Sequence, residues 1–240
     1  MKKKLLLFTL SLAAFSQAAI QTVVPAANRK PSFVLAEQLD IFKLLPAPPA
    51  DPAADIAELK RIQATRTPAQ IEQAKADDLE ESMFIYTSVL GPNFTREKLP
   101  LTAQLSDHAR FDISPVINSA KAHFKRPRPF HYDAEIKPVC KALPFDPNKG
   151  NYAYPSGHAG VGYIEALVLI QMVPEKKDAI LARADQYAHN RVVCGVHYPS
   201  DPPASKATAY ATIGLMMNNP FFRKELQAAK AELRSALGLQ

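Results

Sequence analysis

The sequence predicts an all-α protein that folds as a single-domain helical bundle. Capping residues stand beside Pro just before apolar-periodic runs, as at Thr67-Pro68 and Asn219-Pro220, and this is how helices commonly begin. No window alternates for long between apolar and polar residues, and the Asn-Gly and Asp-Gly pairs that favour hairpins are missing. Helices are therefore expected throughout, and strands are not.

Residues 1–18 are expected to be a signal peptide. They combine a basic start, an apolar run from Leu5 to Phe15, and small residues at the positions of a cleavage site, Ser16 and Ala18. The apolar run is shorter than the roughly 20 residues that a helix needs to span a bilayer. We therefore expect export to the periplasm or the medium, and an uncleaved anchor or interfacial helix is the alternative.

Residues 19–52 are predicted to form an N-terminal tail and a Pro-rich strap. The apolar residues in 33–45 could form a short helix or pack as an extended strap. The prolines in 46–52 remove hydrogen-bond donors and push the residues before them out of the helical region. We expect a stiff connector there that leads into the main domain.

The main domain, residues 53–240, is predicted to be helical. Glu165 and Gln171 interrupt the apolar stretch that starts at Gly157, which favours a buried bundle helix over a membrane span. Periodicity and capping signals predict helices over residues 53–65, 68–89, 95–111, 115–125, 157–172, 175–191, 201–217 and 220–236.

Composition excludes several classes of protein. The chain has 240 residues, of which 47% are hydrophobic and 22% charged, with 8 Gly and 2 Cys. These values exclude collagen-like, disulfide-framework, fully disordered and multi-span membrane proteins. The formal net charge of +6 falls to +3 once the signal lysines Lys2, Lys3 and Lys4 are removed. That surplus is too small to indicate nucleic-acid binding.

The two cysteines, Cys140 and Cys194, would mature in an oxidising compartment after export. A disulfide between them is the favoured interpretation, and two buried free thiols are the alternative. No Cys-x-x-Cys spacing indicates a metal site.

Three clusters suited to binding phosphate stand out once common motifs are excluded. The P-loop, dinucleotide-binding, Gly-x-Ser-x-Gly and His-Glu-x-x-His patterns are all missing. The first cluster runs from Lys121 to Arg128, where Lys supplies a point charge and Arg a planar fork for a tetrahedral oxyanion. A solvated basic helix end is the alternative.

The second cluster is Ser156-Gly157-His158, at the start of the apolar helix. Ser156 can cap this helix while its hydroxyl and the free backbone N–H groups, including that of Gly157, face an anion that the helix dipole also favours. His158 would then stand beside the bound group. A plain N-cap followed by a packed histidine is the alternative.

The third cluster is Arg191, His197 and Asp201. A carboxylate that accepts one imidazole N–H fixes the tautomer and leaves the other ring nitrogen as a nucleophile. A local ion pair between the histidine and the aspartate is the alternative.

In chain order the clusters read Lys-x6-Arg-Pro, Pro-Ser-Gly-His and Arg-x5-His-x3-Asp. This order resembles the signature of the type 2 phosphatidic acid phosphatase superfamily, which also contains bacterial class A nonspecific acid phosphatases and vanadium haloperoxidases. The Leu-Leu-Pro-Ala-Pro-Pro strap, Cys194 and the C-terminal Asn-Pro-Phe-Phe helix make the exported acid phosphatases the most similar group. The resemblance covers most of residues 35–236.

The resemblance implies a metal-independent acid phosphatase that needs no cofactor and hydrolyses phosphate monoesters. In this interpretation His197, oriented by Asp201, attacks phosphorus to form a phosphohistidine, while His158 protonates the leaving alkoxide and later activates water. The phosphate would be held by Lys121, Arg128, Ser156, Gly157 and Arg191. The resemblance also implies that the protein forms a homodimer. Its expected partners are small phosphomonoester molecules.

The chain departs from the family pattern at three positions. Asn190 stands where Ser is usual, Ala159 stands where Thr is frequent, and Pro199 lies inside the third motif. These changes bear on substrate range and rate more than on reaction type. A vanadate-dependent haloperoxidase is the alternative enzyme, although those proteins are usually much longer. A non-catalytic periplasmic anion-binding module is the alternative without turnover, and it would dispense with both histidines.

Overall fold

A computed structural model of the protein describes residues 33–142 and 151–239. The predicted signal peptide, residues 1–18, and the first part of the predicted tail lie outside these residues. Within the two described ranges the regular structure is helical and contains no β-strand, which confirms the all-α prediction.

The helices have the following bounds, with short 3-10 turns between some of them. They are η2 (Ala36–Gln38), α1 (Ile41–Leu44), α2 (Ala53–Thr65), α3 (Pro68–Leu79), η3 (Met83–Tyr86), α4 (Thr87–Leu90), α5 (Pro100–Phe124), α6 (Pro129–Tyr132), α7 (Gly157–Met172), η4 (Pro174–Lys176), α8 (Lys177–Val193), α9 (Asp201–Asn218) and α10 (Pro220–Ala236).

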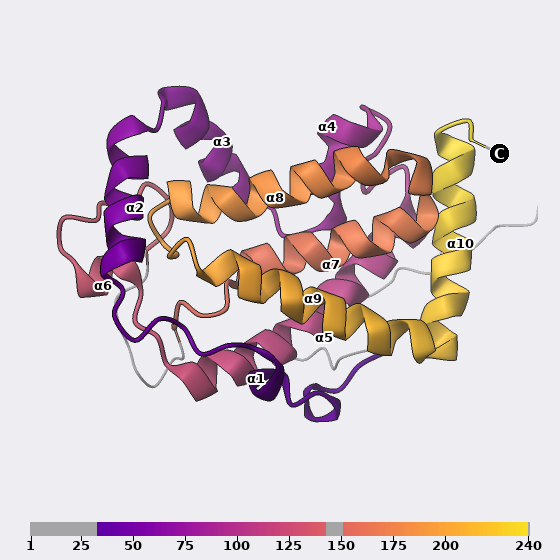
Figure 1. Ribbon diagram of the computed structural model, residues 1–240. Coiled ribbons are helices and arrows are strands. Elements are labelled where there is room, and N and C mark those ends of the chain that lie inside the picture. The colour runs from indigo at the N-terminus through magenta and orange to yellow at the C-terminus, as the bar shows by residue number, and fades with distance from the viewer. Residues whose placement is uncertain (1–32, 143–150, 240) are drawn as a thin grey trace, which may run out of the picture.

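Helix α7 is the centre of the bundle and packs against α5, α8 and α9 (Figure 1). It buries residues on nearly every side, as its uniformly apolar sequence requires. Two glycines allow its neighbours to come close. A Cβ atom at Gly160 would collide with Ile117 of α5, and one at Gly162 would collide with Tyr187 of α8. The bundle is therefore tight around the helix whose first turn was predicted to bind phosphate.

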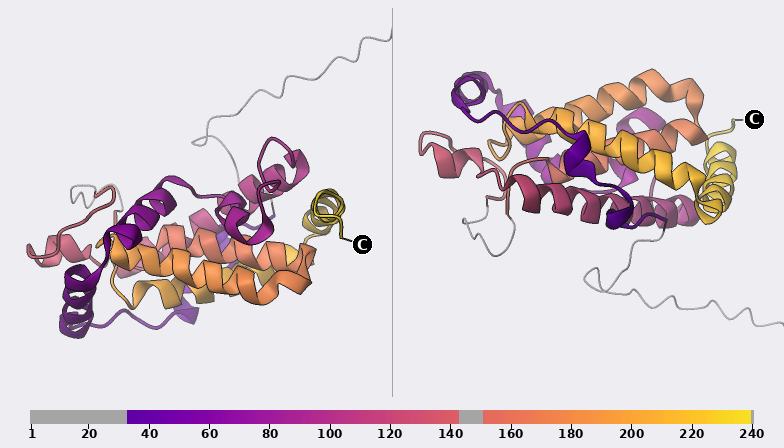
Figure 2. Two further views of the ribbon diagram at one scale, coloured as in Figure 1. Left: turned by 90° about the horizontal axis from the view of Figure 1, so that it is seen from above. Right: turned by 60° about the horizontal axis from the view of Figure 1, so that its bottom comes forward.

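The two ends of the bundle differ. Helix α10 crosses one end, while α2 and the connection from α8 to α9 lie at the other (Figures 1 and 2). Most buried apolar residues form one large cluster around α7. A second, smaller cluster lies at the α2 end, where Leu59 and Ile62 of α2 pack with Val192 and Val193 of α8. The candidate site lies at this second end.

The predicted helices over 95–111 and 115–125 are a single helix, α5, which begins at Pro100 instead of residue 95 and has Pro115 inside it. A proline removes one helical hydrogen bond, and for that reason the prediction divided the helix there. The Ser114 hydroxyl donates to the Arg110 carbonyl at 2.7 Å just before the proline. Ile113 and Val116 on either side are fully buried, so tertiary packing keeps the helix continuous.

The predicted helix over 68–89 is too long, because α3 ends at Leu79. Glu80 is extended, with φ −119° and ψ 120°. Ser82 then accepts a hydrogen bond from the Phe84 backbone N–H and starts the next turn, η3. A residue suited to capping thus interrupts the helix even though the apolar pattern continues.

The other predicted helices agree with the structure. Those over 53–65, 157–172 and 220–236 have these bounds, and those over 175–191 and 201–217 differ by one or two residues. The predicted strap contains η2 and α1 within otherwise extended chain, and 46–52 has no helix. Among the described residues, no helix combines the length and the apolarity that a bilayer span requires.

Candidate active site

Six of the residues predicted for the site line one cavity of about 340 Å³. They are Lys121, Arg128, Gly157, His158, Arg191 and His197. They come from the end of α5, the turn before α6, the first turn of α7, the last turn of α8 and the connection to α9. The three sequence clusters therefore meet at one place in the fold.

His197 is the most deeply buried of these residues, with 1% of its surface exposed. Its Nδ1 lies 3.0 Å from Asp201 Oδ2, and its Nε2 lies 2.7 Å from Arg128 Nη1. A guanidinium can only donate, so Nε2 must accept and Nδ1 must carry the hydrogen. Burial, followed by the charges of Arg128, Lys121 and Arg191, lowers the pKa of His197 well below its usual value. The ring is thus held neutral with the Nε2 lone pair turned toward the cavity residues.

Asp201 orients this ring and is itself held on both oxygens. Its Oδ2 also accepts the backbone N–H of Tyr198 at 2.9 Å, and its Oδ1 accepts Arg126 Nη1 at 2.6 Å. Burial raises the pKa of the Asp201 carboxyl to about 6, against the opposing charge of Arg126. Asp201 is fully buried and contacts His197 from behind, so it positions the ring without lining the cavity.

Arg126 is a site residue that the sequence reasoning missed. Its guanidinium bonds Asp55 of α2 at 2.7 Å and the Ser200 hydroxyl at 2.8 Å, and it lies 3.7 Å from the centre of the Tyr198 ring. It stands within the first motif at a position the pattern leaves open. Arg126 therefore links α2, the helix after the Pro-rich connector, to Asp201, which orients His197.

The cations of the cavity have unused hydrogen-bonding capacity. The Nε atoms of Arg128 and Arg191 are buried and have no hydrogen-bond partner. Burial, and then the charge of Arg128, lowers the pKa of Lys121 well below its usual value. Lys121 Nζ donates to the Tyr152 carbonyl. Buried donors without an acceptor are costly, so this cavity is suited to a group with several anionic oxygens.

Ser156 caps the start of α7, as predicted, and its contact with phosphate stays a prediction. It is fully buried, its hydroxyl accepts the Ala159 backbone N–H at 3.4 Å as an N-cap, and it does not line the cavity. Its carbonyl accepts the Ser205 hydroxyl at 2.9 Å. Gly157 does line the cavity, so the start of α7 reaches the site through its backbone.

Two carboxylates complete the cavity wall, and nothing in the three motifs points to them. Asp78, in α3, lies 2.6 Å from Arg191 Nη1. Glu81 Oε1, from the extended residues after α3, lies 2.9 Å from His158 Nε2. The acidic residues before Ser82 were the only sign of them in the sequence. The predicted helix over 68–89 included these residues, so they were not recognised as part of the site. Among the described residues, no group of three or more His, Cys, Asp or Glu is placed to hold a metal ion.

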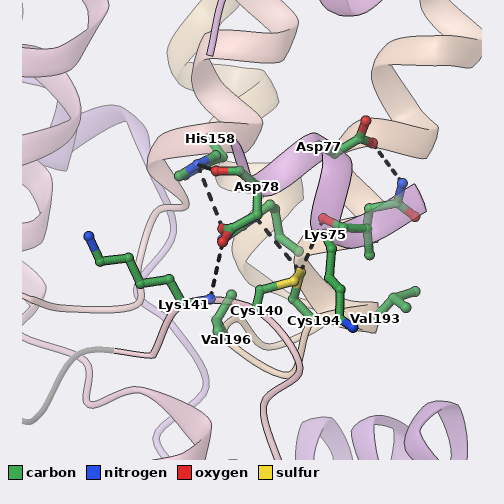
Figure 3. The surroundings of a disulfide bond; sticks show 12 residues. Lys75, Asp77, Asp78, Cys140, Lys141, His158, Val193, Cys194 and Val196 are labelled. Carbon is green, nitrogen blue, oxygen red and sulfur yellow. Dashed lines mark hydrogen bonds and ion pairs between the residues drawn. A yellow bond between two sulfur atoms is a disulfide. The ribbon is translucent and has the colours of Figure 1, made fainter. Parts of the chain in front are cut away.

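Cys140 and Cys194 form a disulfide, with Cα atoms 5.2 Å apart (Figure 3). The backbone N–H of Lys141, the next residue after Cys140, donates to Asp78 at 3.1 Å. Arg191 Nη1 lies 3.8 Å from Cys194 Sγ. The disulfide therefore ties the segment with Lys141, which lines the cavity, to the end of α8.

Asn190, the departure from the third motif, points away from the cavity. Its Nδ2 donates to Asp77 Oδ2 at 2.7 Å, and Asp77 also accepts Arg183 Nη2 at 2.6 Å. All three side chains are buried. Asn190 therefore belongs to an ion-pair network between α3 and α8.

Comparisons with known proteins agree with this arrangement. Residues 113–225 match the model of the PAP2 superfamily. The chain is 30% identical to the non-specific acid phosphatase of Providencia stuartii, over 97% of this chain and 98% of that protein. It is 28% identical to the non-specific acid phosphatase of Salmonella typhimurium, over 97% and 93%. It is 31% identical to the acid phosphatase of Zymomonas mobilis, over 63% of this chain and 56% of that protein.

Proposed function

The chain belongs to the PAP2 superfamily and to its nonspecific acid phosphatases, and we propose that it hydrolyses phosphate monoesters without a metal, through a phosphohistidine at His197. Export through the segment 1–18 and assembly as a homodimer are parts of the same proposal. The names of its relatives support an acid phosphatase, and the chemistry below is inferred from the residues of this chain.

The observation that carries the proposal is the convergence of three cations and two histidines on one cavity in which the Nε atoms of Arg128 and Arg191 are buried without partners. A phosphoryl group offers three equatorial oxygens that need such donors in the transition state. Lys121, Arg128, Arg191 and the backbone of Gly157 would bind them. Fixed protein cations can then supply the stabilisation that a metal ion supplies elsewhere.

The proposed reaction has two steps. In the first, the His197 Nε2 lone pair forms a bond to phosphorus while the bond to the ester oxygen breaks, and His158 gives a proton to that oxygen. In the second, water attacks phosphorus, His158 takes the proton of the water, and the electrons of the P–N bond return to His197. Asp201 stabilises the ring by holding its Nδ1–H throughout.

Turnover of p-nitrophenyl phosphate, with and without EDTA and with vanadate, tests this function. We expect full activity in EDTA and inhibition by vanadate, which mimics pentacoordinate phosphorus. Protein quenched in alkali during turnover should carry phosphate on His197, detected by mass spectrometry. Loss of activity in EDTA that zinc or magnesium restores would contradict the proposal. Cell fractionation would test export, and sedimentation velocity would test the dimer.

A further inference from the structure

Glu81 connects His158 to a cation outside the cavity. Its Oε1 lies 2.9 Å from His158 Nε2. Its Oε2 accepts hydrogen bonds from two nitrogens of Arg110, Nε at 3.0 Å and Nη2. Arg110 belongs to α5, whereas Glu81 follows the end of α3 and His158 starts α7. Three segments therefore meet in a chain that runs from arginine to carboxylate to imidazole.

The two nitrogens of His158 are used unequally. Nε2 contacts Glu81 and also lies 3.2 Å from the carbonyl oxygen of Asp78. Both partners accept, so Nε2 carries a hydrogen. Within the described residues no hydrogen bond engages Nδ1. His197 likewise has a carboxylate, Asp201, on one ring nitrogen, but its second nitrogen accepts a hydrogen bond from Arg128.

Glu81 remains ionised over the acidic range. Burial opposes its charge, but the hydrogen bonds and charges of His158 and Arg110 prevail and lower the pKa of Glu81 to about 2. A fixed negative charge beside an imidazole favours the imidazolium form. The other ionisable groups that line the cavity with His158 are Asp78, Lys121, Arg128, Lys141, Arg191 and His197. Of the two carboxylates, Glu81 lies nearer to His158 Nε2, at 2.9 Å against 3.9 Å for Asp78 Oδ1.

We propose that Glu81, held by Arg110, is a positioning residue that keeps His158 oriented for proton delivery from Nδ1. This inference rests on the proposed function, in which His158 is the general acid. The proton moves from Nδ1 to the ester oxygen as the P–O bond breaks, while Nε2–H stays with Glu81. Nδ1 is then a free base, and it recovers a proton from the attacking water.

The test compares esters with good and poor leaving groups, because a general acid matters most when the leaving group is poor. In Glu81→Gln we expect kcat/KM for an alkyl phosphate to fall by about 10- to 100-fold, and for p-nitrophenyl phosphate to fall much less. The alkaline limb of the pH profile should move to lower pH, because the imidazolium loses its counter-charge. Arg110→Gln should change both quantities in the same direction by a smaller factor. Glu81→Asp, which keeps the charge, should restore part of the rate.

Glu225→Gln is the matched control. Glu225 Oε2 lies 2.8 Å from His108 Nδ1, so this variant also removes a carboxylate from a His–Glu pair, but outside the cavity. We expect it to leave the ester ratio and the pH profile unchanged. Equal losses on both esters in Glu81→Gln, with an unmoved alkaline limb, would overturn the inference.

Two further variants keep the outcome clear. If Glu81→Gln does not fold, the ester ratio and pH profile of Arg110→Gln decide the inference alone. His158→Ala separates the two proposals. If it shows no greater loss on the alkyl ester than on p-nitrophenyl phosphate, the acid role of His158 fails and the inference fails with it. If it shows that greater loss and Glu81→Gln does not, only the inference fails.

Discussion

Two histidine–carboxylate pairs face the same cavity and differ in their contact with water. His197 and Asp201 are 1% and 0% exposed, whereas the side chains of His158 and Glu81 are 23% and 29% exposed. We call His197 and Asp201 the sealed pair, and in it burial and surrounding cations keep the imidazole neutral. We call His158 and Glu81 the open pair, and in it a carboxylate and access to solvent suit a ring that exchanges protons. Similar pairs thus suit opposite tasks because their surroundings differ.

The two pairs are also supported differently. Asp201 is held by Arg126, which in turn is held by Asp55 of α2. Glu81 is held by Arg110 and lies where α3 has just ended. The sealed pair thus depends on a contact with α2, and the open pair depends on where α3 ends.

The largest effect is expected from His197→Ala. It removes the proposed nucleophile from the sealed pair, so kcat for p-nitrophenyl phosphate should fall by about 10⁴-fold or more. Initial rates measured at saturating substrate would check this, with circular dichroism to show that the variant is folded. Full activity in this variant would assign the nucleophile to another residue.

The next effect is expected from Asp201→Asn. The amide no longer forces Nδ1–H on His197, so the lone pair at Nε2 is lost in part of the molecules. We expect kcat to fall by about 10²- to 10⁴-fold while KM changes little. Steady-state kinetics would measure both constants. A loss confined to KM would show that Asp201 acts on substrate binding instead of the ring.

Stability as a function of pH should separate the two carboxylates by the sign of their effect. The pKa of Asp201 is raised from 3.8 to about 6, so its contribution is present below pH 3.8 and is lost as pH rises through 6. The pKa of Glu81 is lowered from 4.5 to about 2, so its contribution is present above pH 4.5 and is lost as pH falls toward 2. The swing for Glu81 is about 3 kcal/mol.

Urea unfolding from pH 3 to 7 checks this difference. Relative to the unmodified protein, Asp201→Asn should lose less stability as pH rises, and Glu81→Gln should lose more. Slopes of the same sign in both variants would show that the two carboxylates do not differ as the structure indicates.

The smallest effect is expected from Asn190→Ser, which belongs to neither pair. The shorter side chain gives up the bond to Asp77, so the free energy of unfolding should fall by about 1–2 kcal/mol. We expect kcat/KM to change by less than about 3-fold, because Asn190 does not line the cavity. Asn218→Ser, at an exposed position of α9, is the control. A change in kcat/KM above tenfold would connect the Asp77 network to catalysis.

Much of the cavity could be predicted from the sequence because its residues stand in short motifs at helix ends. Lys121, Arg128, His158 and Arg191 lie where helices begin or end, and caps and prolines mark those points; His197 lies in the short connection between α8 and α9. Ser156 was predicted to cap α7 and to face phosphate, and the structure shows the cap. Its contact with phosphate stays a prediction.

The remaining site residues required the tertiary structure. Arg126 and Asp55 are 71 positions apart, and Glu81 and Arg110 are 29 apart. No periodic pattern connects such pairs. The helix break that brings Glu81 to His158 was also missed, because the apolar pattern continues past Ser82 and only the cap interrupts it.

The sequence by itself determined the helical class, most helix bounds and the three motifs whose side chains meet in the cavity. These depend on interactions between near neighbours, such as caps, prolines and apolar spacing. Only the tertiary structure decided that α5 continues through Pro115, that Asn190 faces Asp77, and which carboxylate serves each histidine. Those outcomes depend on burial and on partners distant in the chain, which local patterns do not encode.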